Sequence, residues 1–311
     1  MSGTENKRPL LSICIPTYNR ASILDETLFS IISDPDFIQD QIEIIVSDNN
    51  STDNTIEIIK KYPLVNYYSN ENNLLDLNFS YVLQHGNGEY LKLLNDTIRF
   101  LPGGLRYLLD SIKENLHSKY SLFFYNNKTV KKTQIVQCSS LGEFINATSF
   151  YSTWIGNFGI WRRDLSTIKD ISLHDSHLLQ VAWCYKIASK NAVEIYFNNY
   201  LYVKRIPVKD KTGYNVFKVF IENYLSFSQV YLKQKKISRW IYEKNKFTLF
   251  CHFISIRIIW LLFRSKNIMY FDNNGSWKII INNYSYYPYF LIIIIFAGLW
   301  IVLKKCFKRP E

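Results

Sequence analysis

The sequence predicts an α/β fold, in which a mostly parallel sheet is flanked by helices and followed by a helical, membrane-associated C-terminal region. Two apolar runs, 10–15 and 42–46, are nearly continuous, as expected for strands that helices cover on both faces. Strand-like and helix-like segments then alternate up to about residue 116, which indicates parallel strands joined by right-handed crossovers. Two long apolar segments near the C-terminus, 247–263 and 288–303, indicate the membrane-associated region.

The N-terminal half supplies the elements of the predicted sheet. Each expected strand is a run of five or six mainly apolar residues, and the helix after the first strand repeats apolar residues with helical period between Ile23 and Ile32. Ser51 or Thr52 is expected to cap the second helix. The expected strands are 10–15, 42–46, 65–69 and 90–94, and the expected helices are 21–33, 52–61, 75–84 and about 104–116.

Beyond residue 121 the pattern is less regular. The runs 122–125 and 134–138 are predicted to pair with each other as a hairpin, and 156–161 is predicted to form a further strand. A helix is expected at 176–189, and a long, basic, aromatic-rich helical region is expected from 216 to 234.

Charge and cysteine content narrow the possible partners. The chain carries 37 Lys and Arg against 26 Asp and Glu, a formal net charge of +11, which suits nucleic acid, a phosphate-bearing ligand or an anionic membrane. Because the basic residues are dispersed and form no nucleic-acid-binding motif, we expect no nucleic-acid partner. The five cysteines lack paired or metal-ligand spacing and no secretory signal opens the chain, so we expect the N-terminal domain to stay in the reducing cytoplasm.

The two apolar C-terminal segments predict attachment to a membrane. Residues 247–263 include Arg257, while 288–303 carry no charge and are followed by Lys304 and Lys305. With its flanking tyrosines, the second segment reaches the ~20 residues needed to cross a bilayer. Two arrangements stay open, a pair of crossing helices or helices lying in the interface, and in both the basic tail would lie inside. The alternative is a hairpin of core helices within a globular domain.

Polar side chains begin abruptly where the first two strands end, in the loops 16–20 and 47–53. Open α/β sheets bind ligands at the carboxyl ends of parallel strands, so we expect a small polar ligand here. Asp48 can accept hydrogen bonds from the N–H groups of a base, and Arg20 can meet a phosphate. Turn and cap formation is the alternative role for residues 49–51.

Four segments of the N-terminal half carry a family resemblance: "SICIPTYNR", "EIIVSDNNSTDNT", "NENNLLDLNFSYVLQHGNGEYLKLLND" and "FLPGGL". They resemble family 2 glycosyltransferases, inverting enzymes with the GT-A fold, a Rossmann-like fold of nucleotide-diphospho-sugar transferases. The resemblance is specific from Leu10 to about Leu109 and looser to about Lys204. It points to bacterial enzymes that build surface polysaccharides such as O-antigen or capsule.

The resemblance implies which residues hold the nucleotide of a sugar donor. The first loop would contact the nucleotide, and Asp48, at the end of the second strand, would accept hydrogen bonds from the base. The residues expected to bind the donor are Pro16, Thr17, Tyr18, Arg20, Asp48, Asn49, Asn78 and Asn95.

The same resemblance implies a divalent cation, Mn²⁺ or Mg²⁺, on the donor diphosphate. The family usually ends its fourth strand with Asp-x-Asp, whereas this sequence reads Asn95-Asp96-Thr97. Asp96 is therefore the predicted metal ligand, aided by a side-chain oxygen of Asn95 or Thr97, and a single carboxylate predicts weakened metal binding. The alternative is a metal-independent protein, or an inactive one that binds nucleotide sugars or scaffolds other enzymes.

An inverting transfer also needs a base near the acceptor hydroxyl. The resemblance assigns this role to Asp175, which precedes a predicted helix, with His174 where the family has a second acid. The alternative is that Asp175 or Ser176 caps the helix. The resemblance implies that Trp154 and His174 face the acceptor. Aromatic rings stack on sugars, although tryptophans are more often core residues.

These features predict an inverting glycosyltransferase that moves a sugar from a nucleotide-sugar donor to a glycan acceptor on a lipid carrier. It would lie on the cytoplasmic face of the inner membrane. A dinucleotide dehydrogenase is disfavoured because no Gly-x-Gly-x-x-Gly motif follows the first strand. The expected regions are a disordered N-terminus (1–9), the GT-A domain (10–215), a basic helical connector (216–246) and membrane-associated helices with a basic tail (247–311).

Overall fold

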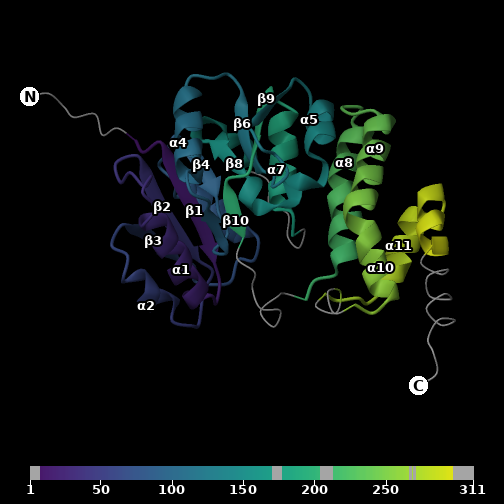
Figure 1. Cartoon of the computed structure of the whole chain (residues 1–311), viewed down its shortest axis with the longest axis horizontal. Coiled ribbons are helices and arrows are strands. Elements are labelled where there is room, and N and C mark those ends of the chain that lie inside the picture. Colours follow the sequence, from purple (N-terminus) through teal and green to yellow (C-terminus); the bar gives the residue numbers. More distant parts are fainter. Residues whose placement is uncertain (1–7, 170–176, 204–212, 266–267, 269–270, 297–311) are drawn as a thin grey trace, which may run out of the picture. The chain divides into compact units, whose positions relative to one another are not determined.

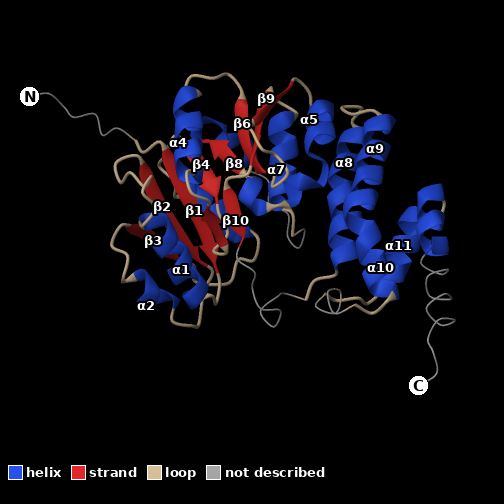
Figure 2. Ribbon diagram, in the orientation of Figure 1, coloured by secondary structure: helices blue, strands red, loops and turns tan. Residues whose placement is uncertain are grey.

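A computed structural model describes residues 8–169, 177–203, 213–265, 268 and 271–296 of the chain. The chain divides into two compact units, Met1–Arg205 and Ile206–Glu311. The first contains all the strands labelled in Figure 1, and the described part of the second is built from helices (Figure 2).

The first unit is organised around a five-stranded sheet. Its strand order is β3 (Val65–Ser69), β2 (Ile42–Asp48), β1 (Leu11–Thr17), β4 (Tyr90–Leu93) and β8 (Gly159–Trp161). The first four strands are parallel, and β8 pairs with β4 in the antiparallel direction at the edge. The predicted α/β fold with a mostly parallel sheet is therefore confirmed, and β1 and β2 lie side by side (Figures 1 and 2).

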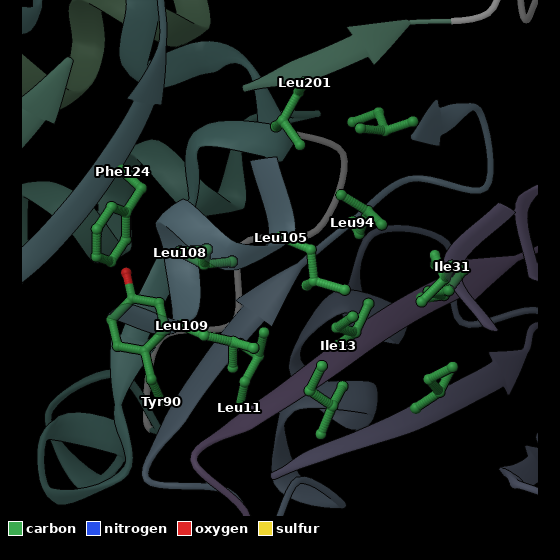
Figure 3. Packing of buried hydrophobic residues seen from close by; sticks show 14 of the residues in the cluster. Leu11, Ile13, Ile31, Tyr90, Leu94, Leu105, Leu108, Leu109, Phe124 and Leu201 are labelled. Atoms are coloured by element: carbon green, nitrogen blue, oxygen red, sulfur yellow. The ribbon is translucent and has the colours of Figure 1, made fainter. Parts of the chain in front are cut away.

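Helices cover both faces of this sheet. Leu11 and Ile13 of β1 belong to the buried cluster formed with residues of α1 (Ala21–Ile32) and α4 (Gly104–Glu114), as Figure 3 shows. On the other face, α3 (Leu77–Gln84) packs against β1, β2 and β4. This double cover explains why both central strands are almost continuously apolar in sequence.

The predicted hairpin of residues 122–125 and 134–138 is wrong. Its two strands, β6 (Ser121–Asn126) and β7 (Gln134–Cys138), both pair with β9 (Val193–Asn198), which lies between them. The difference follows from burial. Val193 and Ile195 are fully buried and suit a central strand, whereas β7 is mostly exposed and suits an edge. A separate two-stranded sheet pairs β5 (Ile98–Phe100) with β10 (Leu201–Val203) in the antiparallel direction.

A buried lysine ties the segment 155–158 to β4. Lys92 is fully buried in β4, and its ammonium donates hydrogen bonds to the carbonyl oxygens of Gly156 and Phe158. Burial lowers the pKa of Lys92 to about 7. These bonds hold the turn that follows Trp154 against the strand that leads into Asp96.

The second unit contains one long helical stretch flanked by shorter helices. α8 (Tyr224–Lys233) precedes α9 (Arg239–Leu249), which continues through 250–254 into α10 (Ser255–Leu262). α11 (Ser276–Tyr284) follows, and residues 288–296 are also helical.

Within the described ranges, one helix, Arg239–Leu262, is long and apolar enough to cross a membrane. A third of its apolar window is buried, and a core helix of a soluble protein passes the same test, so this is weak support for the predicted membrane association. The second predicted segment, 288–303, is described only as far as residue 296.

Candidate functional site

The loops after β1, β2 and β4 meet at one edge of the sheet. Thr17 pairs with Asp48 in the parallel register of β1 and β2, and the backbone N–H of Asn49 donates to the carbonyl oxygen of Thr17 at 2.9 Å. The chain after β4 returns to the same place, where the hydroxyl of Thr17 donates to Oδ2 of Asp96 at 3.1 Å. The two loops predicted to form the site are therefore adjacent, and Asp96 joins them.

Asp96 is the buried charge at the centre of this edge. Its side chain is 2% exposed, and Oδ1 accepts a hydrogen bond from a terminal nitrogen of Arg20 at 3.0 Å. The hydroxyl of Thr27 donates to the Asp96 carbonyl oxygen at 2.6 Å. Burial raises the pKa of the Asp96 carboxyl above its usual value, while Arg20 and Thr17 act in the opposite direction. The negative charge of Asp96 therefore depends on its guanidinium partner.

The Arg20 side chain is only partly buried, with 29% of its surface exposed. A guanidinium has five N–H donors, and the recorded side-chain bond to Asp96 uses one of its nitrogens. Arg20 thus lies between a buried carboxylate and solvent, where it can also donate to an incoming anion.

The predicted metal ligands do not fit a cation held by the protein alone. Asp96 is the single carboxylate of its loop, and its two oxygens are bonded to Arg20 and Thr17. Asn95 is half-buried and Thr97 is buried. In the part of the chain that the structure describes, no cluster of three or more His, Cys, Asp or Glu residues is placed to hold a metal. Hard divalent cations need several oxygen ligands, which this set does not supply.

Asp48 is also buried and held from two sides. Its Oδ1 accepts a hydrogen bond from the backbone N–H of Ser51 at 2.9 Å, and Oδ2 accepts one from the hydroxyl of Tyr67 at 2.8 Å. Burial and the bond to Asp48 raise the pKa of Tyr67 to about 12, so the phenol stays a donor at neutral pH. A carboxylate has about four acceptor positions, and two are used here, so Asp48 can still accept bonds from a base.

The first two loops are locked to each other by hydrogen bonds. The backbone N–H of Asn19 donates to the hydroxyl of Ser51 at 2.8 Å. The side-chain oxygen Oδ1 of Asn19 accepts a hydrogen bond from the backbone N–H of Thr52 at 2.7 Å. Asp53 accepts a bond from the N–H of Ala21 at 2.9 Å, at the start of α1. Tyr18 lies at the loop tip, 44% exposed. The loops are thus fixed in place before any ligand binds.

This interlocking overturns the predicted cap of the second helix. α2 spans Thr55–Ile59, shorter than the expected 52–61, and its N-cap residue Asn54 makes no side-chain cap bond. Ser51 and Thr52 bond across to the first loop instead, so their side chains and backbone groups serve the site and not the helix.

Asn49 and Asn78 occupy supporting positions. Both are buried, and the Asn49 amide bonds to Asn73 at 2.7 Å. The Asn78 amide donates to the carbonyl oxygen of Ser47 at 3.0 Å and accepts a bond from Asn70 at 2.9 Å. These bonds join the end of β2 to the segment before α3. Direct contact of either asparagine with a donor stays a prediction.

Of the predicted acceptor-side residues, the structure describes Trp154. Trp154 is half-buried, packs against the core and lines a pocket of about 340 Å³. Gly156 is packed between the Trp154 ring and Ile98, two residues beyond Asp96. His174 and Asp175 lie outside the described residues. The helix that follows them, α7 (Leu179–Ala188), has Leu178 at its N-cap position, so neither Asp175 nor Ser176 stands there.

Sequence reasoning missed three residues that build the site. Thr27 holds the Asp96 backbone, Tyr67 holds Asp48, and Asp53 caps α1. A signal for Tyr67 was present in the sequence. The strand β3 lies beside β2, so a tyrosine near the carboxyl end of β3 is within reach of Asp48. Thr27 gave no local signal, because its partner lies 69 positions away, and the bond from Ala21 to Asp53 likewise spans 32 positions.

Comparison with known proteins adds independent findings. The family model "Glycosyl transferase family 2" matches residues 12–168. The abequosyltransferase RfbV of Salmonella typhimurium is 33% identical over 165 residues, which cover 43% of this chain and 49% of that protein. The GalNAc(5)-diNAcBac-PP-undecaprenol beta-1,3-glucosyltransferase of Campylobacter jejuni is 33% identical over 112 residues, covering 34% and 35%. The chain thus spans half or less of the length of these curated relatives.

A solved structure supports the fold. TarS 1–349 of S. aureus in complex with UDP-GlcNAc aligns with a TM-score of 0.61 at 19% identity, covering 88% of this chain and 81% of that chain. This likeness shows a shared fold, and the family match spans β1 to the segment after β8, where the candidate site lies. The chain therefore belongs to glycosyl transferase family 2.

Proposed function

We propose that this chain is an inverting glycosyltransferase that moves a sugar from a nucleotide-sugar donor to a lipid-linked glycan acceptor in surface polysaccharide biosynthesis. The observation that carries the proposal is the convergence of Asp48, Arg20 and Asp96 at the carboxyl edge of the parallel sheet. Membership of family 2 and relatives named as glycosyltransferases support the reaction class.

The donor would bind across the loops of β1 and β2. Asp48 would accept hydrogen bonds from the base, as its two unused acceptor positions allow. Arg20, at the start of α1, would donate to the diphosphate. Since Arg20 also neutralises Asp96, the diphosphate and Asp96 would share one guanidinium.

Transfer would be a single displacement. The acceptor oxygen forms a bond to the anomeric carbon while the bond from that carbon to the diphosphate oxygen breaks, and the electron pair leaves with the diphosphate. The acceptor proton passes to a base, for which Asp175 is the predicted residue. Arg20 would stabilise the charge that develops on the departing diphosphate.

The divalent cation stays a prediction of the family resemblance. With Arg20 bonded to Asp96, a cation there would need most of its ligands from the donor. The bonding of Asp96 to Arg20 and Thr17 also favours a second candidate function, because a single paired carboxylate is a poor metal site. This second candidate is a protein that binds a nucleotide sugar without catalysing its transfer.

Two observations support the proposed lipid-linked acceptor and the proposed location at a membrane. The printed name of the Campylobacter jejuni relative includes an undecaprenol-linked substrate, which supports a lipid-linked acceptor here. The apolar helix Arg239–Leu262 supports attachment to a membrane. Since nucleotide sugars are cytosolic, the first unit would lie on the cytoplasmic face of the inner membrane.

Replacing Asp48 with alanine is expected to weaken nucleotide binding by roughly 5- to 150-fold, because base N–H groups would lose their buried acceptor. Calorimetric titration of the full chain with UDP, GDP, CDP and dTDP measures the effect. Glu57→Ala is the matched control, since it removes an exposed carboxylate of α2 that pairs with Lys60 and should leave nucleotide affinity unchanged. Equal affinities of the Asp48 variant and the unaltered chain would remove Asp48 from the site.

Asp175→Asn is expected to reduce turnover by about 10²- to 10⁴-fold and to leave donor affinity unchanged, because a base acts on the acceptor only. Turnover with a glycan acceptor and binding of the nucleotide are measured on the same preparation. Unaltered turnover, with or without a lower unfolding temperature, would rule out Asp175 as the base.

The basic C-terminal tail is expected on the cytoplasmic side. A membrane-impermeant maleimide should label Cys306 in permeabilised cells and not in intact cells, measured in a Cys251→Ser background because Cys251 is the exposed cysteine among those described. Labelling of Cys306 in intact cells would contradict this topology.

A further inference from the structure

A pocket in the second unit carries a positive charge that the described residues do not neutralise. It has a volume of about 430 Å³, within the range of roughly 300–1,000 Å³ typical of ligand sites. Side chains of α8, α9 and the segment 283–287 line it, among them Lys233, Arg239, Glu243, Lys246, Tyr286 and Tyr287. Three of these are basic and one is acidic, which leaves a net charge of +2 at neutral pH.

Lys246 is a buried lysine that lines this pocket. It is 4% exposed, and within the described ranges its ammonium makes no hydrogen bond and no ion pair. The ammonium lies over three tyrosine rings. Its Nζ is 4.8 Å from the ring centroid of Tyr287, 5.1 Å from that of Tyr284 and 5.7 Å from that of Tyr286. Ring faces stabilise a cation, but they leave its N–H groups available to an acceptor.

The acid in the pocket is already engaged elsewhere. Glu243 accepts a hydrogen bond from Arg239 Nε at 2.7 Å through one oxygen and from the hydroxyl of Tyr287 at 2.6 Å through the other. It therefore pairs with Arg239, one turn away on α9, and acts on Lys246 through its charge without forming an ion pair with it. Burial lowers the pKa of Lys246, and the charge of Glu243 acts in the opposite direction. An anion bound directly to the ammonium would further offset the cost of its burial.

We propose that this pocket binds a phosphate or diphosphate group. Lys246, Lys233 and the remaining donors of Arg239 provide charge-assisted hydrogen bonds from two helices, which suits an anion with several oxygens and about two charges. Two sources of this chemistry fit the position. A soluble phosphate can enter from solvent, and a lipid headgroup can enter where the apolar helix Arg239–Leu262 begins, beside Trp240, which is 73% exposed.

The test is calorimetric titration of the detergent-solubilised full chain with inorganic diphosphate. Lys246→Met keeps the length and apolar contacts of the side chain and is expected to weaken binding at least about tenfold. Lys244→Met is the matched control, because it removes an equal charge from an exposed position of the same helix that does not line the pocket, and it should change binding less than about twofold. Lys246→Arg should restore most of the affinity.

Folding and the donor site are controlled separately. If Lys246→Met lowers the unfolding temperature, the variant Lys233→Met is used in its place, because Lys233 is an exposed residue that lines the pocket. Lys233→Met should weaken diphosphate binding about threefold or more. Nucleotide affinity should be the same in all these variants, since they leave Asp48 and Arg20 intact. Equal weakening by Lys246→Met and Lys244→Met, or no binding of diphosphate, would overturn the proposal.

Vesicles distinguish the two sources. Phosphatidylcholine vesicles with and without phosphatidic acid are floated with the full chain. Binding to the phosphatidic acid vesicles that needs Lys246 and is reversed by diphosphate assigns a lipid headgroup. Diphosphate binding that needs Lys246, without such vesicle binding, assigns a soluble phosphate. Vesicle binding that Lys246→Met and Lys244→Met reduce equally would contradict a specific site.

Discussion

A buried carboxylate beside an arginine organises the functional edge of this protein. Asp96 follows β4 by three residues, and it bonds to Thr17 of β1 and to Arg20 before α1, while Thr27 of α1 bonds to its backbone. Removing a carboxylate from water is costly unless a partner compensates, so Asp96 and Arg20 stabilise each other. The strand β1, the helix α1 and the chain after β4 therefore converge on one ion pair.

This constraint shapes the proposed chemistry. Arg20 is the partly exposed member of the pair, so a donor diphosphate would draw on a charge that is already in place. Asp48 is fixed in the same way by Tyr67 and Ser51, and the loops that carry both residues are bonded to each other. Such preorganisation lowers the cost of binding because little ordering is left to occur. In the proposed anion pocket of the second unit, Lys246 is likewise a buried charge that is held in place before a ligand binds.

The sequence was sufficient for features that depend on local pattern. Continuous apolar runs predicted β1 and β2, and the polar residues that follow them include Asp48 and Arg20, which lie at the same edge of the sheet. Features that depend on distant partners were not predictable. The guanidinium of Arg20 meets a carboxylate 76 residues away, Ser51 bonds to Asn19 instead of capping α2, and β9 separates β6 from β7. In each case a tertiary contact outcompeted the local alternative.

The most direct test of the central claim is a crystal structure of the chain with a bound nucleoside diphosphate. The account predicts that the base edge lies within hydrogen-bond distance of the Asp48 carboxylate and that a diphosphate oxygen accepts a bond from the Arg20 guanidinium. A nucleotide bound at any other surface, with Asp48 bonded only to Tyr67 and Ser51 and Arg20 only to Asp96, would contradict it.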